Sequence, residues 1–306
     1  MYQQNQVNPR ENVRITVFTP AYNRGYIIEN LYHSLQRQTY RDFEWLVVDD
    51  GSQDDTGERF QRMMADENDF PIRYIRQENG GKHRAINAGV TEARGELFLI
   101  VDSDDYLTDD ALEMVDKVEK TIPLDEKAGF AGVCGLRAYD ANRIIGTTFQ
   151  GDTLDITMLQ RNKYGISGDK AEAFYTQIMR RYPFPEFPGE KFLTECVVWD
   201  KIAADGFKLR FYNHNTIICN YLEDGLTKNL DRLILSNPRG QALYLRQSVA
   251  FGTLKGVEKC NAYVGFYESL RTQYTFSEIA EYLQMDPVKL RFSLLGMRIY
   301  RRLLER

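Results

Sequence analysis

The chain has 306 residues, enough for one large domain or two smaller ones, and 43% of them are hydrophobic, which is ample for a buried core. Its net charge of −5 disfavours a general nucleic-acid-binding protein, so we expect no nucleic-acid partner. The four cysteines are scattered without a CxxC pair, which argues against a zinc site or a disulfide framework and indicates a reducing, cytoplasmic setting.

The first part of the chain alternates strand and helix patterns. Residues 1–12 are polar and predict a disordered lead-in, without the apolar core of a signal peptide. Apolar and β-branched runs predict four strands, at residues 13–19, 44–48, 72–76 and 97–101. Helical spacing predicts four helices: one carrying Ile27, Ile28, Leu31 and Leu35, one carrying Phe60, Met63 and Met64, one at residues 85–93, and one beginning at Asp109 or Asp110. This alternation indicates βαβ units and a parallel sheet.

The pattern changes from about residue 128. Further strands are predicted at residues 129–139, 143–149, 207–211 and 216–221, and helices at residues 171–181 and 192–204. From about residue 230 the pattern is helical to the end of the chain. We therefore expect an α/β domain at residues 13–228, with halves at 13–120 and 121–228, followed by a helical extension at 229–306. No run approaches the roughly 20 apolar residues that cross a bilayer.

The predicted strand at residues 97–101 runs directly into a group of acids, Asp102, Ser103, Asp104 and Asp105. Its residues are apolar on both faces, as in a parallel sheet that helices cover on both sides. Side chains at positions i and i+2 of an extended chain point the same way, so Asp102 and Asp104 can face one point. A divalent ion such as Mg²⁺ can join two carboxylates to the phosphates of a substrate. The alternative is an acidic loop in which Asp104 or Asp105 caps the next helix.

Polar clusters follow three of the predicted strands, at residues 20–23, 49–52 and 102–105. Ligands of open α/β sheets bind at the carboxyl ends of the strands, where these clusters would meet. No GxGxxG motif opens the first helix, and residues 80–83 lack the flanking residues of a P-loop, which disfavours both of those nucleotide sites. The three histidines, His33, His83 and His214, lack the spacing of metal ligands.

Residues 13 to about 120 resemble the nucleotide-sugar-binding half of the family 2 glycosyltransferases. The resemblance rests on the order and spacing of four motifs: Val-Phe-Thr-Pro-Ala-Tyr-Asn-Arg at 17–24, Val-Val-Asp-Asp-Gly-Ser at 47–52 with Asp54 and Thr56, Asn-Gly-Gly-Lys at 79–82 with Asn-Ala-Gly at 87–89, and Asp-Ser-Asp-Asp at 102–105. It implies the GT-A fold, a Rossmann-like, mostly parallel sheet flanked by helices.

The resemblance also implies a donor site for a nucleotide sugar, most simply one linked to UDP. Its members would be Thr19, Pro20, Tyr22, Asn23, Arg24, Asp50, Gly81, Lys82, Asn87, Asp102 and Ser103. Tyr22 can stack on the base, and Asp50 can accept a hydrogen bond from a base N–H. Asp102 and Asp104 would hold Mg²⁺ or Mn²⁺. Many members carry Ala-Arg-Asn where this chain has Ala-Ile-Asn at 85–87, so Lys82 or Arg84 would supply the missing positive charge.

The second half of such enzymes binds the acceptor and carries an acid near the start of a helix, before a tryptophan. Glu195, four residues before Trp199, resembles this acid and is our candidate for the catalytic base, although Cys196 replaces the aspartate that usually follows. Glu190 and Asp169 are the other acids weighed for this role. Residues 168–172 and 221–227 resemble stretches of a bacterial subgroup that builds surface polysaccharides.

The expected activity is therefore metal-dependent, inverting transfer of a sugar from a nucleotide diphosphate to an acceptor glycan or lipid-linked glycan. The Gln-x-x-Arg-Trp motif of processive synthases is missing, which favours addition of single sugars. The alternatives are a nucleotidyltransferase and a non-catalytic sugar-nucleotide-binding protein.

Residues 289–304 mix apolar and basic positions at helical spacing, so this helix can contact the inner face of an anionic membrane or pack on its own domain.

Overall fold

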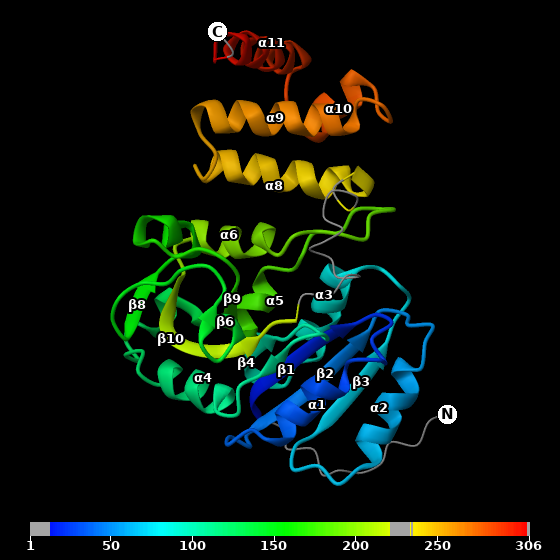
Figure 1. The fold of residues 1–306 in the computed structure, drawn as a ribbon, viewed down its shortest axis with the longest axis vertical. Helices are drawn as coiled ribbons and strands as arrows, with labels where there is room; N and C mark the ends of the chain where they lie inside the picture. The colour runs from blue at the N-terminus through cyan, green and yellow to red at the C-terminus, as the bar shows by residue number, and fades with distance from the viewer. Residues whose placement is uncertain (1–12, 221–232, 234, 305–306) are drawn as a thin grey trace.

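The computed structural model describes residues 13–220, 233 and 235–304, which form a mixed α/β body beneath a stack of helices (Figure 1). The predicted lead-in at 1–12, the motif at 221–227 and the predicted boundary between residues 228 and 229 lie outside the described residues. In the described part of the chain, the strands form one sheet in the order β3-β2-β1-β4-β9-β6-β10-β5, with β7 paired to β6 and β8 paired to β10.

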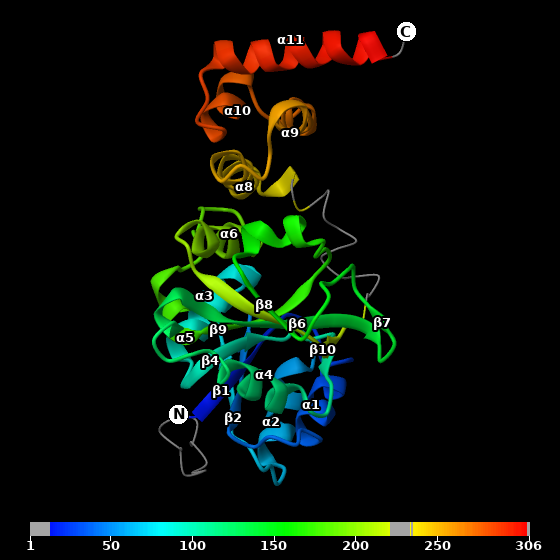
Figure 2. The same cartoon turned by 90° about the vertical axis from the view of Figure 1, so that its left-hand side faces the viewer.

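The first half is the predicted alternation of parallel strands and helices. Its elements are β1 (Val13–Ala21), α1 (Glu29–Gln36), β2 (Phe43–Asp49), α2 (Thr56–Ala65), β3 (Ile72–Arg76), α3 (Lys82–Glu92) and β4 (Gly95–Ile100). Helices α1, α2 and α4 lie against one face of the sheet, and α3 and α5 lie against the other (Figure 2). Coverage on both faces explains why β2 is buried along its whole length.

The rest of the α/β body, from β5 onward, continues the same sheet with shorter and partly antiparallel strands. Its elements are β5 (Tyr106–Leu107), α4 (Ala111–Glu119), β6 (Phe130–Asp140), β7 (Arg143–Ile144), β8 (Thr153–Ile156), β9 (Lys170–Tyr175), α5 (Thr176–Arg181), α6 (Cys196–Ala204) and β10 (Lys208–Ile218), with 3-10 turns at Lys127–Gly129 and Met158–Tyr164. Strand β9 runs antiparallel between β4 and β6, so it joins the two halves into one sheet.

Several predictions for the second half are wrong. The predicted helix at residues 171–181 is strand β9 followed by the short helix α5, because residues 170–175 pair with β6 and β4 on either side. The helix predicted at 192–204 begins only at Cys196. The strands predicted at 207–211 and 216–221 are one bulged strand, β10, which ends at Ile218. Of the strand predicted at 143–149, only Arg143–Ile144 is paired as β7.

The predicted helical extension is confirmed in the described residues. It consists of α8 (Pro238–Ala250), α9 (Gly256–Leu270), α10 (Phe276–Tyr282) and α11 (Pro287–Leu304), stacked above α6 (Figures 1 and 2). The extension has an apolar core of its own that includes Leu245, Phe266 and Leu290. None of the described helices is long and apolar enough to cross a membrane.

The core of the sheet is dominated by aromatic rings. Phe18 and Phe98 stack with ring centroids 4.9 Å apart, between β1 and β4. Gly89 of α3 lies directly against Phe18, and a Cβ atom there would come within 2.1 Å of the ring. This glycine therefore lets α3 approach the sheet closely and brings its first residue, Lys82, to the edge where the strands end.

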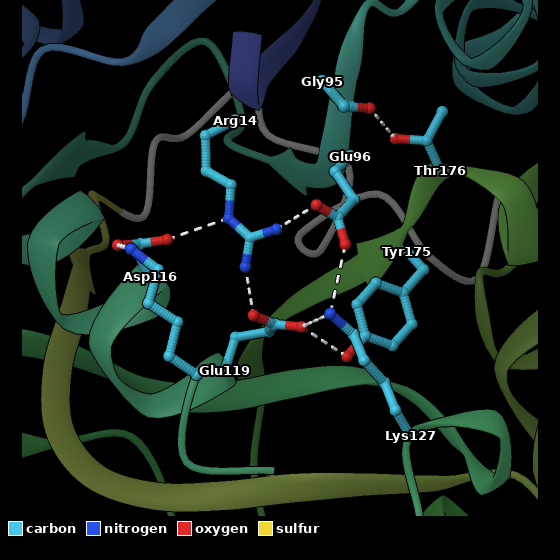
Figure 3. Close-up of polar contacts among 9 residues, drawn as sticks. Arg14, Gly95, Glu96, Asp116, Glu119, Lys127, Tyr175 and Thr176 are labelled. Carbon is cyan, nitrogen blue, oxygen red and sulfur yellow. Dashed lines mark hydrogen bonds and ion pairs between the residues drawn. The ribbon is translucent and has the colours of Figure 1, made fainter. Parts of the chain in front are cut away.

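An ion-pair network lies at the opposite end of the sheet, where β1 and β4 begin (Figure 3). Arg14 of β1 pairs with Glu119 and with Asp116, which lies 2.8 Å away, both on α4. The carboxylate of Glu119 is 1% exposed and also accepts hydrogen bonds from Lys127, at 2.6 Å, and from the hydroxyl of Tyr175, at 2.7 Å. Burial opposes its charge, but these bonds and Arg14 hold the pKa of Glu119 below its usual value. The network ties β1, α4 and β9 together.

Glu119→Gln is expected to lower the free energy of unfolding by about 3 kcal/mol, because it leaves two cations facing a neutral amide in a buried site. Since the native pKa of Glu119 is depressed, its contribution is present above the unfolded pKa and is lost as the pH falls through the native pKa. The stability difference between wild type and variant should therefore shrink from about pH 6 to about pH 3. Chemical denaturation across this range measures it.

Glu96→Gln is the matched control, because Glu96 also pairs with Arg14 but its side chain is 50% exposed. Its cost should stay below about 1 kcal/mol, since exposed ion pairs contribute little. If the two substitutions lowered the free energy of unfolding equally, burial of Glu119 would not be the reason for its contribution.

Candidate active site

A cleft with a volume of about 650 Å³ lies where β1, β2 and β4 end, between the two halves of the α/β body. Residues predicted for the donor site, the metal and the base meet there. The predicted residues that line the cleft are Pro20, Tyr22, Arg24, Asp50, Gly81, Lys82, Asp102, Ser103, Asp104 and Glu195. Tyr22 is 44% exposed, so its side chain is accessible to a ligand.

Three predicted residues lie behind the lining of the cleft. Thr19 is fully buried, and its hydroxyl accepts a hydrogen bond from the indole of Trp45 at 3.0 Å. The amide of Asn23 joins the loops after β1 and β2, since its oxygen accepts from the backbone N–H of residue 53 at 2.8 Å. The amide of Asn87 binds both backbone groups of Phe184. These side chains hold loops in place and do not face the cleft.

Asp50 anchors the glycine turn that precedes α3. One carboxylate oxygen accepts from the side chain of Gln77 at 2.7 Å and from the N–H of Gly80 at 2.9 Å. The other accepts from the N–H of Gly81 at 2.7 Å and from Asn79 at 3.2 Å. These four bonds use the four lone-pair positions of a carboxylate. In this structure Asp50 therefore orders the glycine turn. Because its lone pairs are used in these four bonds, the carboxylate is not available to a base N–H.

The acids at the end of β4 are compensated by cations from two directions. One carboxylate oxygen of Asp102 lies 2.6 Å from Nζ of Lys82, and the other lies 3.3 Å from a guanidinium nitrogen of Arg137. The same nitrogen lies 3.1 Å from Asp105. Burial disfavours the charge of Asp102, but Lys82 and Arg137 hold its pKa well below the usual value. Asp102 is therefore ionised.

Asp104 and Asp105 have different environments. Asp105 is buried and accepts hydrogen bonds from the backbone N–H of Asn220 at 3.1 Å and from the thiol of Cys219 at 3.3 Å. Within the described part of the chain, the side chain of Asp104 has no ion pair or hydrogen bond to another residue. Burial and the nearby charge of Asp102 raise its pKa. Helix α4 begins at Ala111, so neither acid caps it, and the alternative reading of this loop is wrong.

Asp102 and Asp104 fit a divalent cation that is shared with a phosphate ligand. Carboxylate oxygens are the hard donors that Mg²⁺ and Mn²⁺ accept, and Mg²⁺ usually takes one or two carboxylates together with substrate phosphates. No group of three or more His, Cys, Asp or Glu residues suited to a metal occurs among the described residues. The two aspartates would thus be joined by phosphate and water oxygens around the ion.

Of the two residues considered for the missing positive charge, Lys82 and Arg84, only Lys82 lines the cleft. Its ammonium bridges Asp102, at 2.6 Å, and Glu195, at 2.7 Å. Arg84 turns the other way and donates to the backbone carbonyls of Phe187, at 2.9 Å, and Glu190, at 2.7 Å. Arg84 therefore fastens the segment before α6 to α3.

Glu195 occupies the N-terminal position of α6 and faces Asp102 across Lys82. Its side chain is 31% exposed and makes no capping hydrogen bond to the helix. Trp199 packs one turn later against Phe174 of β9, with ring centroids 4.5 Å apart, which fixes the direction of α6. Glu190 has a structural role instead, because its carboxylate accepts from two backbone N–H groups at the start of α8, at 2.8 Å each.

The side of the cleft formed by the second half contains charged residues that the sequence analysis did not single out. They are Arg137, Arg161, Glu172 and Asp200. Burial raises the pKa of Asp200 to about 6 and also raises that of Glu172. Nε of Arg161 is buried and has no hydrogen-bond partner in the described part of the chain. Arginine or glutamate inside an otherwise apolar strand, as in β6 and β9, is the sequence signal that could have identified two of them.

Comparison with known proteins supports the resemblance. Residues 16–141 match the family model described as "Glycosyl transferase family 2". Glycosyltransferase GlyG of Streptococcus pneumoniae is 43% identical over 101 residues, which cover 32% of this chain and 33% of that protein. A "GalNAc(5)-diNAcBac-PP-undecaprenol beta-1,3-glucosyltransferase" of Campylobacter jejuni is 29% identical over 207 residues, covering 66% of this chain and 62% of that protein. The chain spans about a third or less of the length of the first curated relatives it matches.

Solved structures confirm the predicted GT-A fold. Residues 1–349 of TarS from S. aureus, in complex with UDP-GlcNAc, superpose with a TM-score of 0.57 at 19% identity, covering 93% of this chain and 91% of that one. The mannosyltransferase PcManGT from Pyrobaculum calidifontis, in complex with GDP-Man and Mn²⁺, gives a TM-score of 0.53 at 18% identity, covering 94% and 76%. At these identities the likeness establishes the fold.

Proposed function

We propose that this chain, whose residues 16–141 belong to glycosyl transferase family 2, is a metal-dependent inverting glycosyltransferase that adds single sugars. The donor would be a nucleotide diphosphate sugar, most simply a UDP-sugar, and the acceptor a hydroxyl of a glycan or lipid-linked glycan in surface polysaccharide synthesis. The observation that carries the proposal is the placement of Asp102 and Asp104 on one side of a cleft and Glu195 on the other, with Lys82 between them.

The known relatives support this choice of substrates. TarS structures contain UDP or UDP-GlcNAc, and the PcManGT structure contains GDP-Man and Mn²⁺. The name of the Campylobacter jejuni relative includes a PP-undecaprenol-linked glycan. A panel of UDP- and GDP-sugars, scored for Mn²⁺-dependent thermal stabilisation and for hydrolysis, tests the donor directly. Stabilisation without any turnover or transfer would favour a non-catalytic sugar-nucleotide-binding protein, and release of diphosphate from a nucleoside triphosphate would favour a nucleotidyltransferase.

The donor would lie along the carboxyl ends of the parallel strands. The exposed ring of Tyr22 would stack on the base, and the Gly80–Gly81 turn that Asp50 orders would approach the nucleotide closely. Asp102 and Asp104 would hold Mg²⁺ or Mn²⁺. When bound, this ion offsets the negative charge that develops on the leaving diphosphate.

Glu195 would act as the base for the acceptor. It would take the proton of the acceptor hydroxyl as that oxygen forms a bond to the anomeric carbon and the bond to the diphosphate oxygen breaks. Attack from the side opposite the diphosphate inverts the anomeric centre. Arg161, Glu172 and Asp200 would hydrogen-bond the acceptor sugar, because they line the cleft beyond Glu195.

Asp104→Ala should reduce transfer to less than about a tenth of the wild-type rate, a barrier increase of at least 1.4 kcal/mol, because it removes one of two protein ligands of the ion. Binding of UDP should also lose its dependence on Mn²⁺. Initial rates and calorimetric titrations measure the two effects. Asp109→Ala is the control, since the Asp109 side chain is 62% exposed and pairs with Arg37 away from the cleft. A variant of Asp104 that keeps more than a tenth of the rate would show that this residue is not a required metal ligand.

Glu195→Gln should lower the transfer rate by about 10²- to 10⁴-fold, because the amide keeps the shape of the side chain but cannot accept the proton. Affinity for UDP should stay near the wild-type value, which separates a loss of chemistry from a loss of donor binding. Asp169→Asn is the comparison, because Asp169 also lines the cleft. If Asp169→Asn loses activity while Glu195→Gln keeps it, the base is misassigned.

The last helix carries an apolar stripe that the protein leaves exposed. Leu290 of α11 is fully buried against the extension, whereas Val288, Phe292 and Leu295 are 58%, 69% and 54% exposed at a spacing that places them on one face. We propose that this stripe, with exposed basic neighbours such as Arg291, contacts an anionic membrane surface where a lipid-linked acceptor would lie.

Phe292→Ser should therefore reduce co-sedimentation of the full chain with phosphatidylglycerol-containing vesicles, and added salt should weaken wild-type binding. Val257→Ser is the matched control, because Val257 is 44% exposed on α9. Wild-type protein that binds these vesicles no better than pure phosphatidylcholine vesicles would remove the membrane proposal.

A further inference from the structure

Lys82 bridges the two functional acids of the cleft. It is the first residue of α3, and its Nζ atom lies 2.6 Å from Asp102 and 2.7 Å from Glu195, which come from opposite halves of the protein. Its side chain is only 22% exposed, so solvent screens these pairs less than it would on the surface. One ammonium group thus neutralises both the carboxylate expected to bind the metal and the carboxylate expected to act as base.

Lys82 and a divalent ion would compete for the same carboxylate. Both oxygens of Asp102 already face cations, Lys82 on one side and Arg137 on the other. An ion bound to Asp102 at about 2.1 Å would lie within a few ångströms of the ammonium. Like charges this close together repel in a site that solvent screens weakly. The ion therefore binds poorly while the ammonium stays beside Asp102.

A bound nucleotide diphosphate would remove the competition between Lys82 and the ion for Asp102. It brings negative charge to the ion, and Lys82 has a flexible four-carbon stem that lets its ammonium move from a carboxylate to a phosphate oxygen. Two neighbouring cations are held by other groups: Arg84 donates to backbone carbonyls of the segment before α6, and Lys191 donates to the side-chain oxygen of Asn79 at 2.8 Å. Lys82 is therefore the residue placed to make this exchange.

We propose that Lys82 is a positioning residue that makes metal binding depend on the donor, by occupying Asp102 until a nucleotide diphosphate draws its ammonium away. This inference rests on the proposed function. It has a second consequence, since the same ammonium holds Glu195. The carboxylate of Glu195 is held at 2.7 Å by Lys82, so the movement that admits the ion also frees this carboxylate to face an acceptor hydroxyl.

Calorimetric titration of the full chain with Mn²⁺ alone, and then with UDP at saturating Mn²⁺, tests the proposal. Lys82→Met should bind Mn²⁺ alone about tenfold more tightly than wild type, because it removes the competing charge. The same variant should bind UDP about tenfold more weakly, because it loses a phosphate ligand. Lys82→Arg keeps the charge and should stay near wild type for Mn²⁺ alone. Lys201→Met is the charge-matched control, since Lys201 pairs with Asp205 at the far end of α6 and should change neither affinity.

Opposite changes in the two affinities of Lys82→Met, in a variant that still unfolds cooperatively, would support the proposal. Mn²⁺ affinity that is equal to or weaker than that of wild type would overturn it while leaving the proposed function intact. Wild-type protein that binds neither Mn²⁺ nor UDP would overturn the proposed function and this inference together.

Discussion

The structure depends on how it compensates three aspartates placed together at the end of a buried strand. Strand β4 is apolar from Leu97 to Ile100. Asp102, Asp104 and Asp105 follow it in a partly enclosed cleft, where uncompensated charges would be costly. The compensation comes from both halves: Lys82 approaches from α3, and Arg137 from β6. The acid cluster is therefore fully compensated only when the two halves are joined, and strand β9 between β4 and β6 joins them.

The same arrangement explains why Asp50, Asn79 and Arg84 bind protein groups in this structure. Asp50 accepts hydrogen bonds from the glycine turn before α3. The side-chain oxygen of Asn79 accepts one from Lys191, in the segment before α6, and Arg84 donates to backbone carbonyls of that same segment. Each bond places either Lys82 or Glu195. These polar contacts act on the site through position, because they hold the ammonium and the carboxylate within 3 Å of each other across two halves of the chain.

The sequence predicted the parts of the protein that follow local rules. The apolar runs of β1, β2 and β4 and the acids that follow them are visible in the chain, because strand period and turn chemistry are local properties. Strand β9 was predicted as a helix, because Ala-Glu-Ala-Phe-Tyr suits either structure, and pairing with β4 and β6 decided the outcome. Arg137 was missed for a related reason: its importance comes from Asp102 and Asp105, which lie more than thirty positions earlier and meet it only in the folded sheet.

The helical extension is coupled to the site through the segment that carries the candidate base. The carboxylate of Glu190 accepts both backbone N–H groups at the start of α8, and the side-chain oxygen of Asn237 accepts the backbone N–H groups of Lys191, at 2.7 Å, and Phe192, at 3.0 Å. A negative charge at a helix N-terminus is favourable, so Glu190 stabilises α8 while α8 fixes the backbone five residues before Glu195. Two acids in one short segment thus have separate roles. One fastens the extension, and the other is left to face the cleft.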